Sequence, residues 1–323
     1  MKRRDILATA AFAAGGAFPA AAQRSRTLRF AHFSPTSDPN HESATMFANQ
    51  VRDATNGEIT VRIFPSAQLG GEVDAVEGVL LGTIDVSIPS TAVLANWIPE
   101  MNVLNMPFAF RDWDHYTRVV HGPLLDRIAE ASATKNIRVL GMLTSGARHI
   151  MTRAPLNSFE DLRGRKIRTV QNPVHVATFN AFGANATAIA YPEVYSSLQT
   201  GVVDGADAAN TNYFTEKFYE VAPHWAQVSW LFYSNSIIMR EDRFRALPAE
   251  RQRQLSEIGR TVGMDHFVRY RRSDEETLGR LVAAGVRVTR PDPAPFRAAS
   301  RQIQDRFLTG ERERQLFSLI SAE

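Results

Sequence analysis

Short runs of β-branched and aromatic residues alternate with segments of helical periodicity, and this alternation constrains the fold more than any other feature of the sequence. Residues 28–33 and 59–64 have the composition of strands, and apolar side chains recur between them at helical spacing. The second half repeats the pattern with strand-like runs at 137–143 and 166–170. Strands that alternate with helices are typical of α/β domains. We therefore predict an α/β fold.

The domain organisation follows from length and composition. A chain of 323 residues is long enough for two domains of ordinary size, and its hydrophobic content of 44% is that of a soluble globular protein. No stretch rich in Gly, Ser or Pro forms a linker, so two domains would be joined by several short crossings. Such an arrangement suits a hinged cleft. Residues 249–284 form the longest predicted helix.

The first 22 residues have the features of an export signal. Lys2, Arg3 and Arg4 precede an uncharged run rich in Ala and Gly, which ends in a cleavage site of A-x-A type at Ala22. A membrane anchor is the competing interpretation, but Pro19 and the Ala/Gly content weaken it. The paired arginines fit a twin-arginine signal or an ordinary basic leader equally well. We expect a cleaved signal peptide over residues 1–22 and a periplasmic protein.

Several classes of chemistry are disfavoured. The chain has no Cys, which excludes disulfides, thiolate catalysis and Cys-ligated metals. The eight His residues include no i,i+4 pair, and no nucleotide-binding or nucleophile-elbow motif is present. The formal net charge is only +3, and aromatic residues do not interleave with a basic stripe. We expect no metal, no cofactor and no nucleic-acid partner.

A block in the second half carries a family resemblance. Lys166-Ile167-Arg168 is followed by Gly183-Ala184 and by the run from Tyr191 to Gly205, which reads YPEVYSSLQTGVVDG. This pattern resembles the DctP-type solute-binding proteins of tripartite ATP-independent periplasmic (TRAP) transporters. The FPSAQLGG segment at 64–71 and the LNMPF segment at 104–108 agree with it.

The resemblance implies a receptor rather than an enzyme. Such a receptor captures an organic acid and delivers it to the small and large membrane subunits of a TRAP transporter, and we expect it to be a monomer. The implied fold has two α/β lobes around a hinged cleft, with a long helix along both. We assign 23–145 plus 234–273 to the first lobe and 146–233 plus 274–323 to the second.

Two arginines match ligand-binding positions of the family. Arg168, in the K-I-R strand, matches the arginine that grips the ligand carboxylate, and Arg148 matches a second arginine near it. The chemistry fits, because a planar guanidinium donates two parallel hydrogen bonds to a carboxylate and a Lys ammonium does not. Without the resemblance, each would be a solvated surface cation.

Three aromatic residues are candidates for the walls of the cleft. Tyr191 precedes the PEVY segment, where relatives often have an aromatic ring against the ligand, and core packing is the alternative. Trp230 lies in a region that lines the cleft in relatives, again with core packing as the alternative. Phe33 ends the first predicted strand and either faces the ligand or forms the cleft wall.

The polar candidates depart further from the family pattern. Some relatives complete the carboxylate clamp with a large side chain where this chain has Ala208, so neighbouring Asp207 or Asn210 would have to serve instead. Glu72 follows a double glycine and either hydrogen-bonds a ligand hydroxyl or stabilises a helix N-terminus. A sialic-acid ligand is disfavoured, because residues 88–91 read IPST where sialic-acid receptors have a glutamate.

The aromatic candidates favour a monocarboxylate with an apolar or aromatic body as the ligand. The alternatives are a C4-dicarboxylate or a sugar acid, received by the same class of transporter. Three rival functions are an exported enzyme acting on a small organic acid, a receptor that presents its ligand to a sensor protein, and an ABC-type receptor.

Overall fold

The computed structural model describes residues 26–322, so the expected signal peptide lies outside the described residues. The strands are β1 (Arg26–Ala31), β2 (Ile59–Phe64), β3 (Val86–Ser87), β4 (Ile137–Thr152), β5 (Lys166–Thr169), β6 (Asn185–Ala188), β7 (Gly205–Ala208), β8 (His224–Arg240) and β9 (Arg287–Thr289). The α-helices are α1 (Pro39–Ala54), α2 (Glu72–Leu81), α3 (Thr91–Leu94), α4 (Trp113–Val120), α5 (Pro123–Ala133), α6 (Pro173–Ala181), α7 (Val194–Thr200), α8 (Asn210–Thr215), α9 (Glu241–Arg245), α10 (Ala249–Ala283), α11 (Pro293–Phe307) and α12 (Glu311–Ala322). Short 3₁₀ helices are η1 (Pro99–Asn105), η2 (Glu160–Leu162), η3 (Tyr191–Glu193) and η4 (Phe218–Glu220).

All nine strands belong to one sheet, in the order β2-β1-β3-β8-β4-β7-β5-β6, with β9 paired to β8. The antiparallel strands β4 and β8 run through the whole molecule. We call the part containing β1–β3 the first lobe and the part containing β5–β7 the second lobe. The β4–β8 register shifts between Thr144 and Ala147, next to the predicted lobe boundary.

The strand directions bring the functional end of each lobe to the middle of the molecule. β3 is antiparallel to β8, and β7 is antiparallel to β4, so the carboxyl ends of the short strands in both lobes point toward residues 144–148 of β4. Ligands of α/β sheets bind at the carboxyl ends of the strands. The topology therefore predicts a site between the lobes.

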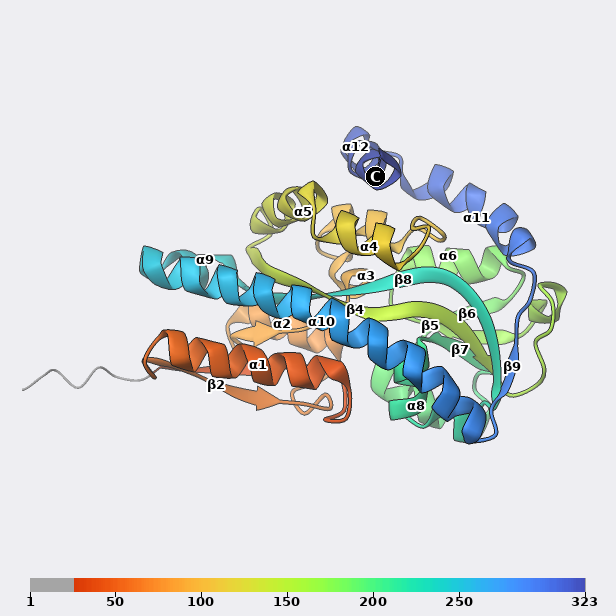
Figure 1. Cartoon of the computed structure of the whole chain (residues 1–323). Helices are drawn as coiled ribbons and strands as arrows, with labels where there is room; N and C mark the ends of the chain where they lie inside the picture. The colour runs from red at the N-terminus through yellow and green to blue at the C-terminus, as the bar shows by residue number, and fades with distance from the viewer. Residues whose placement is uncertain (1–25, 323) are drawn as a thin grey trace, which may run out of the picture.

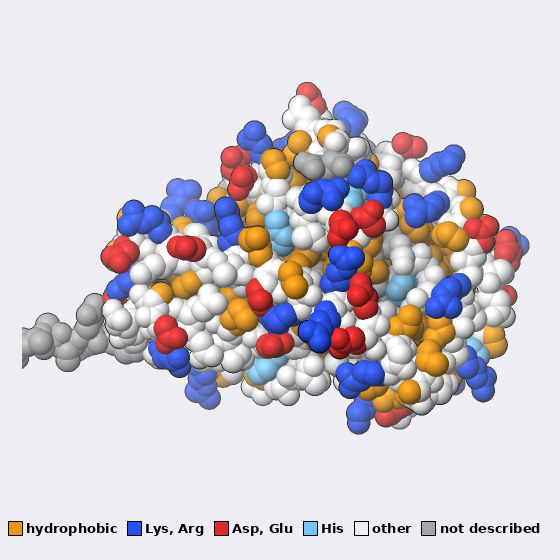
Figure 2. Space-filling model, viewed as in Figure 1, with side chains coloured by type: hydrophobic (Ala, Val, Ile, Leu, Met, Phe, Trp, Pro, Cys, Tyr) orange, Lys and Arg blue, Asp and Glu red, His pale blue; other side chains and the backbone are white. Residues whose placement is uncertain are grey.

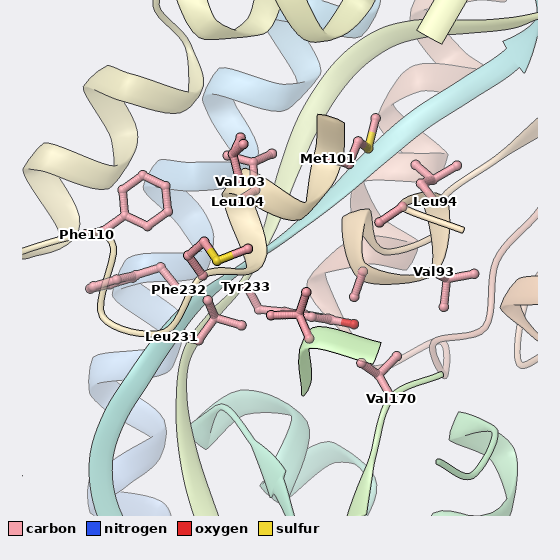
Figure 3. Packing of buried hydrophobic residues seen from close by; sticks show 14 of the residues in the cluster. Val93, Leu94, Met101, Val103, Leu104, Phe110, Val170, Leu231, Phe232 and Tyr233 are labelled. Atoms are coloured by element: carbon pink, nitrogen blue, oxygen red, sulfur yellow. The ribbon is translucent and has the colours of Figure 1, made fainter. Parts of the chain in front are cut away.

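Helices cover both faces of the sheet (Figure 1). α10 crosses one face and contacts α1 in the first lobe, β4, and α8 in the second lobe. The opposite face carries the largest hydrophobic cluster, to which α3–α6, η1, α11 and α12 contribute. Figure 3 shows side chains of α3, η1 and β8 packed together in this cluster. Burial of these apolar faces is the main favourable term in the stability of such a fold.

The exposed face of α10 is mostly charged, although Met264, Val268 and Val282 are also exposed there. Arg271 pairs with Glu275, and Arg272 with Glu276, at i,i+4 spacing. Figure 2 shows acidic and basic side chains interspersed over this side of the molecule. Such exposed pairs contribute only about 0.3–0.5 kcal/mol each, so the buried face of α10 holds it in place.

The α/β fold and the long helix that contacts both lobes agree with the sequence analysis. The two central strands are longer than expected, since the run predicted at 137–143 continues to Thr152. The lobe boundaries stay a prediction. α12, which that prediction assigns to the second lobe, packs against α5 and η1 of the first, and His115 Nε2 lies 2.8 Å from its Ile320 carbonyl oxygen.

No helix among residues 26–322 is long and apolar enough to cross a membrane.

Candidate functional site

A small cavity lies between the two lobes, where the topology predicts a site. Its volume is only about 20 Å³, far below the roughly 300–1,000 Å³ that is typical of ligand pockets, so an organic acid could enter only if the lobes moved apart. Both lobes and both central strands contribute side chains. The lining residues are Phe33, Glu72, Ser145, Arg148, Arg168, Val170, Tyr191, Asn212 and Tyr233.

Arg168 is a buried cation without an acidic hydrogen-bond partner. It lies on β5 and is only 2% exposed. Its Nε donates to the Ile189 carbonyl oxygen at 2.9 Å, and its two terminal nitrogens make no hydrogen bond to the described residues. Burial lowers the pKa of Arg168, because the charged form is poorly solvated. An anion in the cavity would supply the missing interaction.

Arg148, on β4, is held in place by Asp207 of the adjacent strand β7. Its Nε donates to Asp207 Oδ2 at 2.8 Å, and its Nη2 donates to the Asp207 carbonyl oxygen at 2.5 Å. Burial alone would lower the pKa of Arg148, but the Asp207 carboxylate outweighs burial and raises it. Burial likewise opposes ionisation of Asp207, but Arg148 brings its pKa below the usual value. The Arg148–Asp207 pair is therefore ionised. The Nη1 of Arg148 makes no hydrogen bond to the described residues and is available to a ligand.

Glu72 places a carboxyl group in the same cavity from the first lobe. It is the first residue of α2, and its Oε2 accepts a hydrogen bond from the Ser90 backbone N–H at 2.6 Å. Burial raises the pKa of Glu72, although Arg168 and Arg148 favour the ionised form. Its Oε1 has no hydrogen-bond partner among the described residues, so it is available to a ligand donor.

Aromatic and amide groups complete the walls. The Phe33 and Tyr191 rings meet edge to face across the cleft, with centroids 5.1 Å apart. The Tyr191 hydroxyl is buried without a hydrogen-bond partner among the described residues. Asn212 Nδ2 donates to Asp38 Oδ2 at 2.7 Å, which links the two lobes beside the cavity. The Asn212 Oδ1 accepts from the Tyr270 hydroxyl of α10 at 2.9 Å.

The structure brings five of the eight predicted site residues to this cavity, namely Phe33, Glu72, Arg148, Arg168 and Tyr191. A sixth, Asp207, stands behind Arg148 rather than at the cavity wall. Direct contact of any of them with a ligand stays a prediction.

The other two predicted residues lie elsewhere. Trp230 is fully buried in the large hydrophobic cluster, with its ring against His175 and Phe179. The Asn210 side chain donates a hydrogen bond to Asp274 of α10 and accepts one from the indole N–H of Trp225. Neither lines the cavity.

Four cavity residues were not predicted: Ser145, Val170, Asn212 and Tyr233. Ser145 begins the SGAR segment and Val170 follows Arg168, so nearness to the two arginines could have indicated both. Asn212 is two residues after Asn210 on α8, and side chains two apart on a helix point to nearly opposite sides. Choosing between Asn210 and Asn212 requires knowing which face of α8 is turned toward the cavity.

The comparisons with known proteins identify the family of the chain. The family model described as "DctP: Bacterial extracellular solute-binding protein, family 7" matches residues 30–310. The chain belongs to this family. DctP proteins are the periplasmic solute-binding proteins of TRAP transporters, and they are receptors for organic acids rather than enzymes.

Individual relatives are similar along nearly their whole length. The 2,3-diketo-L-gulonate-binding periplasmic protein of Escherichia coli is 28% identical over 311 residues, which cover 95% of each protein. A TRAP periplasmic solute-binding protein of Xanthobacter autotrophicus with bound β-D-galacturonate is 29% identical, with a TM-score of 0.89 over 91% of this chain and 99% of its own. One of Roseobacter denitrificans with bound β-D-glucuronate is 28% identical, with a TM-score of 0.88 over 92% and 99%.

Among the described residues, no group of three or more His, Asp or Glu side chains is arranged to hold a metal ion. The donors at the cavity suit an organic anion instead.

Proposed function

We propose that this DctP protein is the receptor for a small sugar acid, a ligand with one carboxylate and several hydroxyl groups. The observation that carries the proposal is the pairing, in one polar cavity, of the arginines Arg148 and Arg168 with the single carboxyl group of Glu72. The arginines would bind the carboxylate of the ligand, and Glu72 would accept hydrogen bonds from its hydroxyls.

The arginines favour an acid because Arg168 forms no ion pair or hydrogen bond with an acidic side chain among residues 26–322, although Asp207 and Glu72 lie near enough to stabilise its charge. Charge-assisted hydrogen bonds contribute on the order of 1.5–3 kcal/mol each, and micromolar affinity requires about 8 kcal/mol. Hydrogen bonds to the hydroxyls and contact with the aromatic walls would provide the remainder.

Glu72 distinguishes a sugar acid from the two other ligand classes. A second ligand carboxylate beside Glu72 would face a like charge, which disfavours a C4-dicarboxylate. An apolar or aromatic body would leave the second Glu72 oxygen without a hydrogen-bond partner, at a cost of about 1–3 kcal/mol. The sugar-acid alternative is therefore better supported than the apolar monocarboxylate that the sequence analysis favours.

The compounds bound to relatives support the same choice. Galacturonate and glucuronate each combine one carboxylate with a polyhydroxylated ring, and they occupy proteins of the same fold at 28–29% identity. The E. coli relative is named for 2,3-diketo-L-gulonate, which is also a sugar acid.

We further infer that the exported protein, cleaved near Ala22, acts as a monomer in the periplasm and delivers its ligand to the small and large membrane subunits of a TRAP transporter. The ligand would touch Arg168 in one lobe and Glu72 in the other, so it would stabilise the closed arrangement of the lobes. Differential affinity for that arrangement is what lets a membrane partner distinguish loaded from empty receptor.

Titration calorimetry with a matched acid panel tests the proposal. D-Gluconate and D-glucarate have the same six-carbon chain and differ in one terminal carboxylate, and D-glucuronate adds the ring form. Succinate represents the small dicarboxylates and phenylacetate the aromatic monoacids. We expect micromolar or tighter binding of a monocarboxylate sugar acid. Tight binding of succinate or phenylacetate without any sugar-acid binding would refute the proposal.

A further inference from the structure

We infer that Asn172 is a positioning residue that couples the carboxylate-binding strand to the opposite lobe and thereby sets the affinity for the ligand. Asn172 lies in the turn between β5 and α6, four residues after Arg168. It lines no part of the ligand cavity, and its side chain is fully engaged elsewhere.

The two ends of the Asn172 amide have different partners. Its Oδ1 accepts hydrogen bonds from the backbone N–H groups of Val174 at 2.7 Å and His175 at 3.3 Å, so it caps the N-terminus of α6 in the second lobe. Its Nδ2 donates to the Ala92 carbonyl oxygen at 2.8 Å and to Asn102 Oδ1 at 3.1 Å, both in the first lobe. Because Asn172 is only 2% exposed, these bonds are shielded from water.

Neighbouring groups reinforce this connection. The Gln171 carbonyl oxygen accepts from Asn96 Nδ2 at 3.0 Å, and the imidazole of His175 lies 3.0 Å from Asn105 Oδ1. The Asn105 amide donates to the Met101 carbonyl oxygen, so its Oδ1 is left to accept from the ring. Gln171, Asn172 and His175 thus make hydrogen bonds to the first lobe, and Asn172 makes two of these four bonds.

The coupling bears on binding because the two sides of the cavity belong to different lobes. Arg168 extends from β5 directly before the turn, whereas Glu72 and Phe33 come from the first lobe. A ligand held by both sides requires β5 at a fixed distance from the first lobe, and Asn172 fixes that distance. Any loss of the closed population lowers the apparent affinity in proportion.

Two substitutions separate the bridge from the helix cap. Ser is as good an N-cap as Asn, but its hydroxyl is too short to reach Ala92 and Asn102. Asn172→Ser therefore removes the bridge and keeps the cap, whereas Asn172→Ala removes both. We expect Asn172→Ser to weaken binding on the order of tenfold to a hundredfold and to accelerate ligand dissociation. Its ligand-free form should still unfold cooperatively, with a melting temperature above that of Asn172→Ala, because the helix cap is kept.

The matched control is Asn180→Ser on the same helix. Asn180 is exposed and accepts only from the Ala186 backbone N–H within the second lobe, so this variant should bind as wild type does. The inference rests on the proposed carboxylate role of Arg168 but not on the choice of sugar acid. Wild-type protein is therefore titrated first with the acid panel above, and the acid that it binds most tightly serves as the probe for every variant.

The outcomes are distinct. Weakened binding in both Asn172 variants, with a stable ligand-free Ser variant and a normal Asn180 control, supports the inference. Wild-type affinity in Asn172→Ser overturns it, whether or not Asn172→Ala is impaired, because the residue would then act only as a helix cap. A wild-type protein that prefers a dicarboxylate contradicts the proposed function but leaves the Asn172 comparison valid with that acid.

Discussion

Arg168 combines deep burial with the lack of an acidic hydrogen-bond partner, which is an expensive arrangement for a cation. A lone buried charge is destabilising unless a counter-charge is supplied. Arg148, on β4, differs because Asp207 already neutralises it. The two guanidinium groups therefore differ: Asp207 holds that of Arg148 in position, and we propose that the ligand carboxylate pairs with that of Arg168.

Replacing Arg168 tests this division directly. We expect Arg168→Ala to weaken acid binding at least a hundredfold, the equivalent of about 3 kcal/mol, since two charge-assisted bonds are lost. Arg168→Lys should also bind poorly, because an ammonium cannot form the bidentate pair. Titration calorimetry measures the affinity, and thermal unfolding should show ligand-free protein at least as stable as wild type. Near-normal affinity in either variant would contradict the assignment.

Glu72 should control the choice between mono- and dicarboxylates. Glu72→Gln keeps an oxygen for the Ser90 N–H but removes the negative charge. We expect gluconate binding to weaken about tenfold, because a charged acceptor is replaced by a neutral one, and glucarate to lose less affinity or to gain some. The measured quantity is the ratio of the two affinities in wild type and variant. An unchanged ratio would mean that Glu72 does not face the ligand.

At the scale of elements, the contact between α10 and β4 is unusually close. A Cβ on Gly259 would lie 2.6 Å from the Leu140 carbonyl oxygen, and one on Gly263 would lie 2.4 Å from that of Met142. Backbone atoms of a strand cannot move aside cheaply, so the helix depends on these glycines. Their position lets one helix rest directly on a central strand that both lobes share.

A pair of alanine substitutions tests this packing. Gly259→Ala should lower the free energy of unfolding by about 1–3 kcal/mol, because the added methyl overpacks the contact. Gly279→Ala, in the same helix, meets no atom within 4 Å and should raise stability by about 0.5–1 kcal/mol through helix propensity. Urea unfolding of both variants measures the difference. Equal effects of the two substitutions would show that the close approach has no energetic consequence.

Local pattern predicted the elements better than it predicted their arrangement. The helix expected at 249–284 is observed as Ala249–Ala283. It was predictable because a helical periodicity of 3.6 residues per turn, sustained over many residues, is a strong signal. The length of β4 was missed, since its second half carries the polar segment Ser145–His149, which does not look like a buried strand. Likewise, the burial of Trp230 and the exchange of Asn210 for Asn212 depend on tertiary contacts that no local pattern specifies.

At the scale of the whole molecule, buried neutral histidines dominate the expected response to acid. Burial is the main cause that lowers the pKa of six of the eight histidines. It lowers the pKa to about 4 for His32, His121 and His266 and to about 3 for His149 and His175, and it also lowers the pKa of His224. Below pH 6.5 the unfolded chain binds protons at these positions and the folded protein does not, so stability falls as the pH falls.

Buried carboxyl groups with a raised pKa have the opposite effect on stability, because they bind protons in the folded protein more readily than in the unfolded chain. They are fewer than the buried histidines. Burial raises the pKa of Asp38 and Asp274 to about 6, that of Glu216 to about 7 and that of Glu72 above its ordinary value, so these groups favour the folded state at lower pH. We expect the histidines to prevail, with a melting temperature about 5–10 °C lower at pH 4.5 than at pH 7. Differential scanning calorimetry at constant ionic strength measures it. A melting temperature that is flat or rises toward acid would contradict this balance.

The lobes meet around the cavity through Asp38–Asn212, Phe33–Tyr191 and the hydrogen bonds of Asn172, so the proposed ligand site is part of the interface between the lobes. A crystal structure of the protein with D-glucuronate tests the account most directly. We expect the carboxylate within hydrogen-bond distance of the terminal nitrogens of Arg168 and of Arg148, and a hydroxyl on Glu72. A ligand bound with its carboxylate away from Arg168, or bound outside this cavity, would contradict the account.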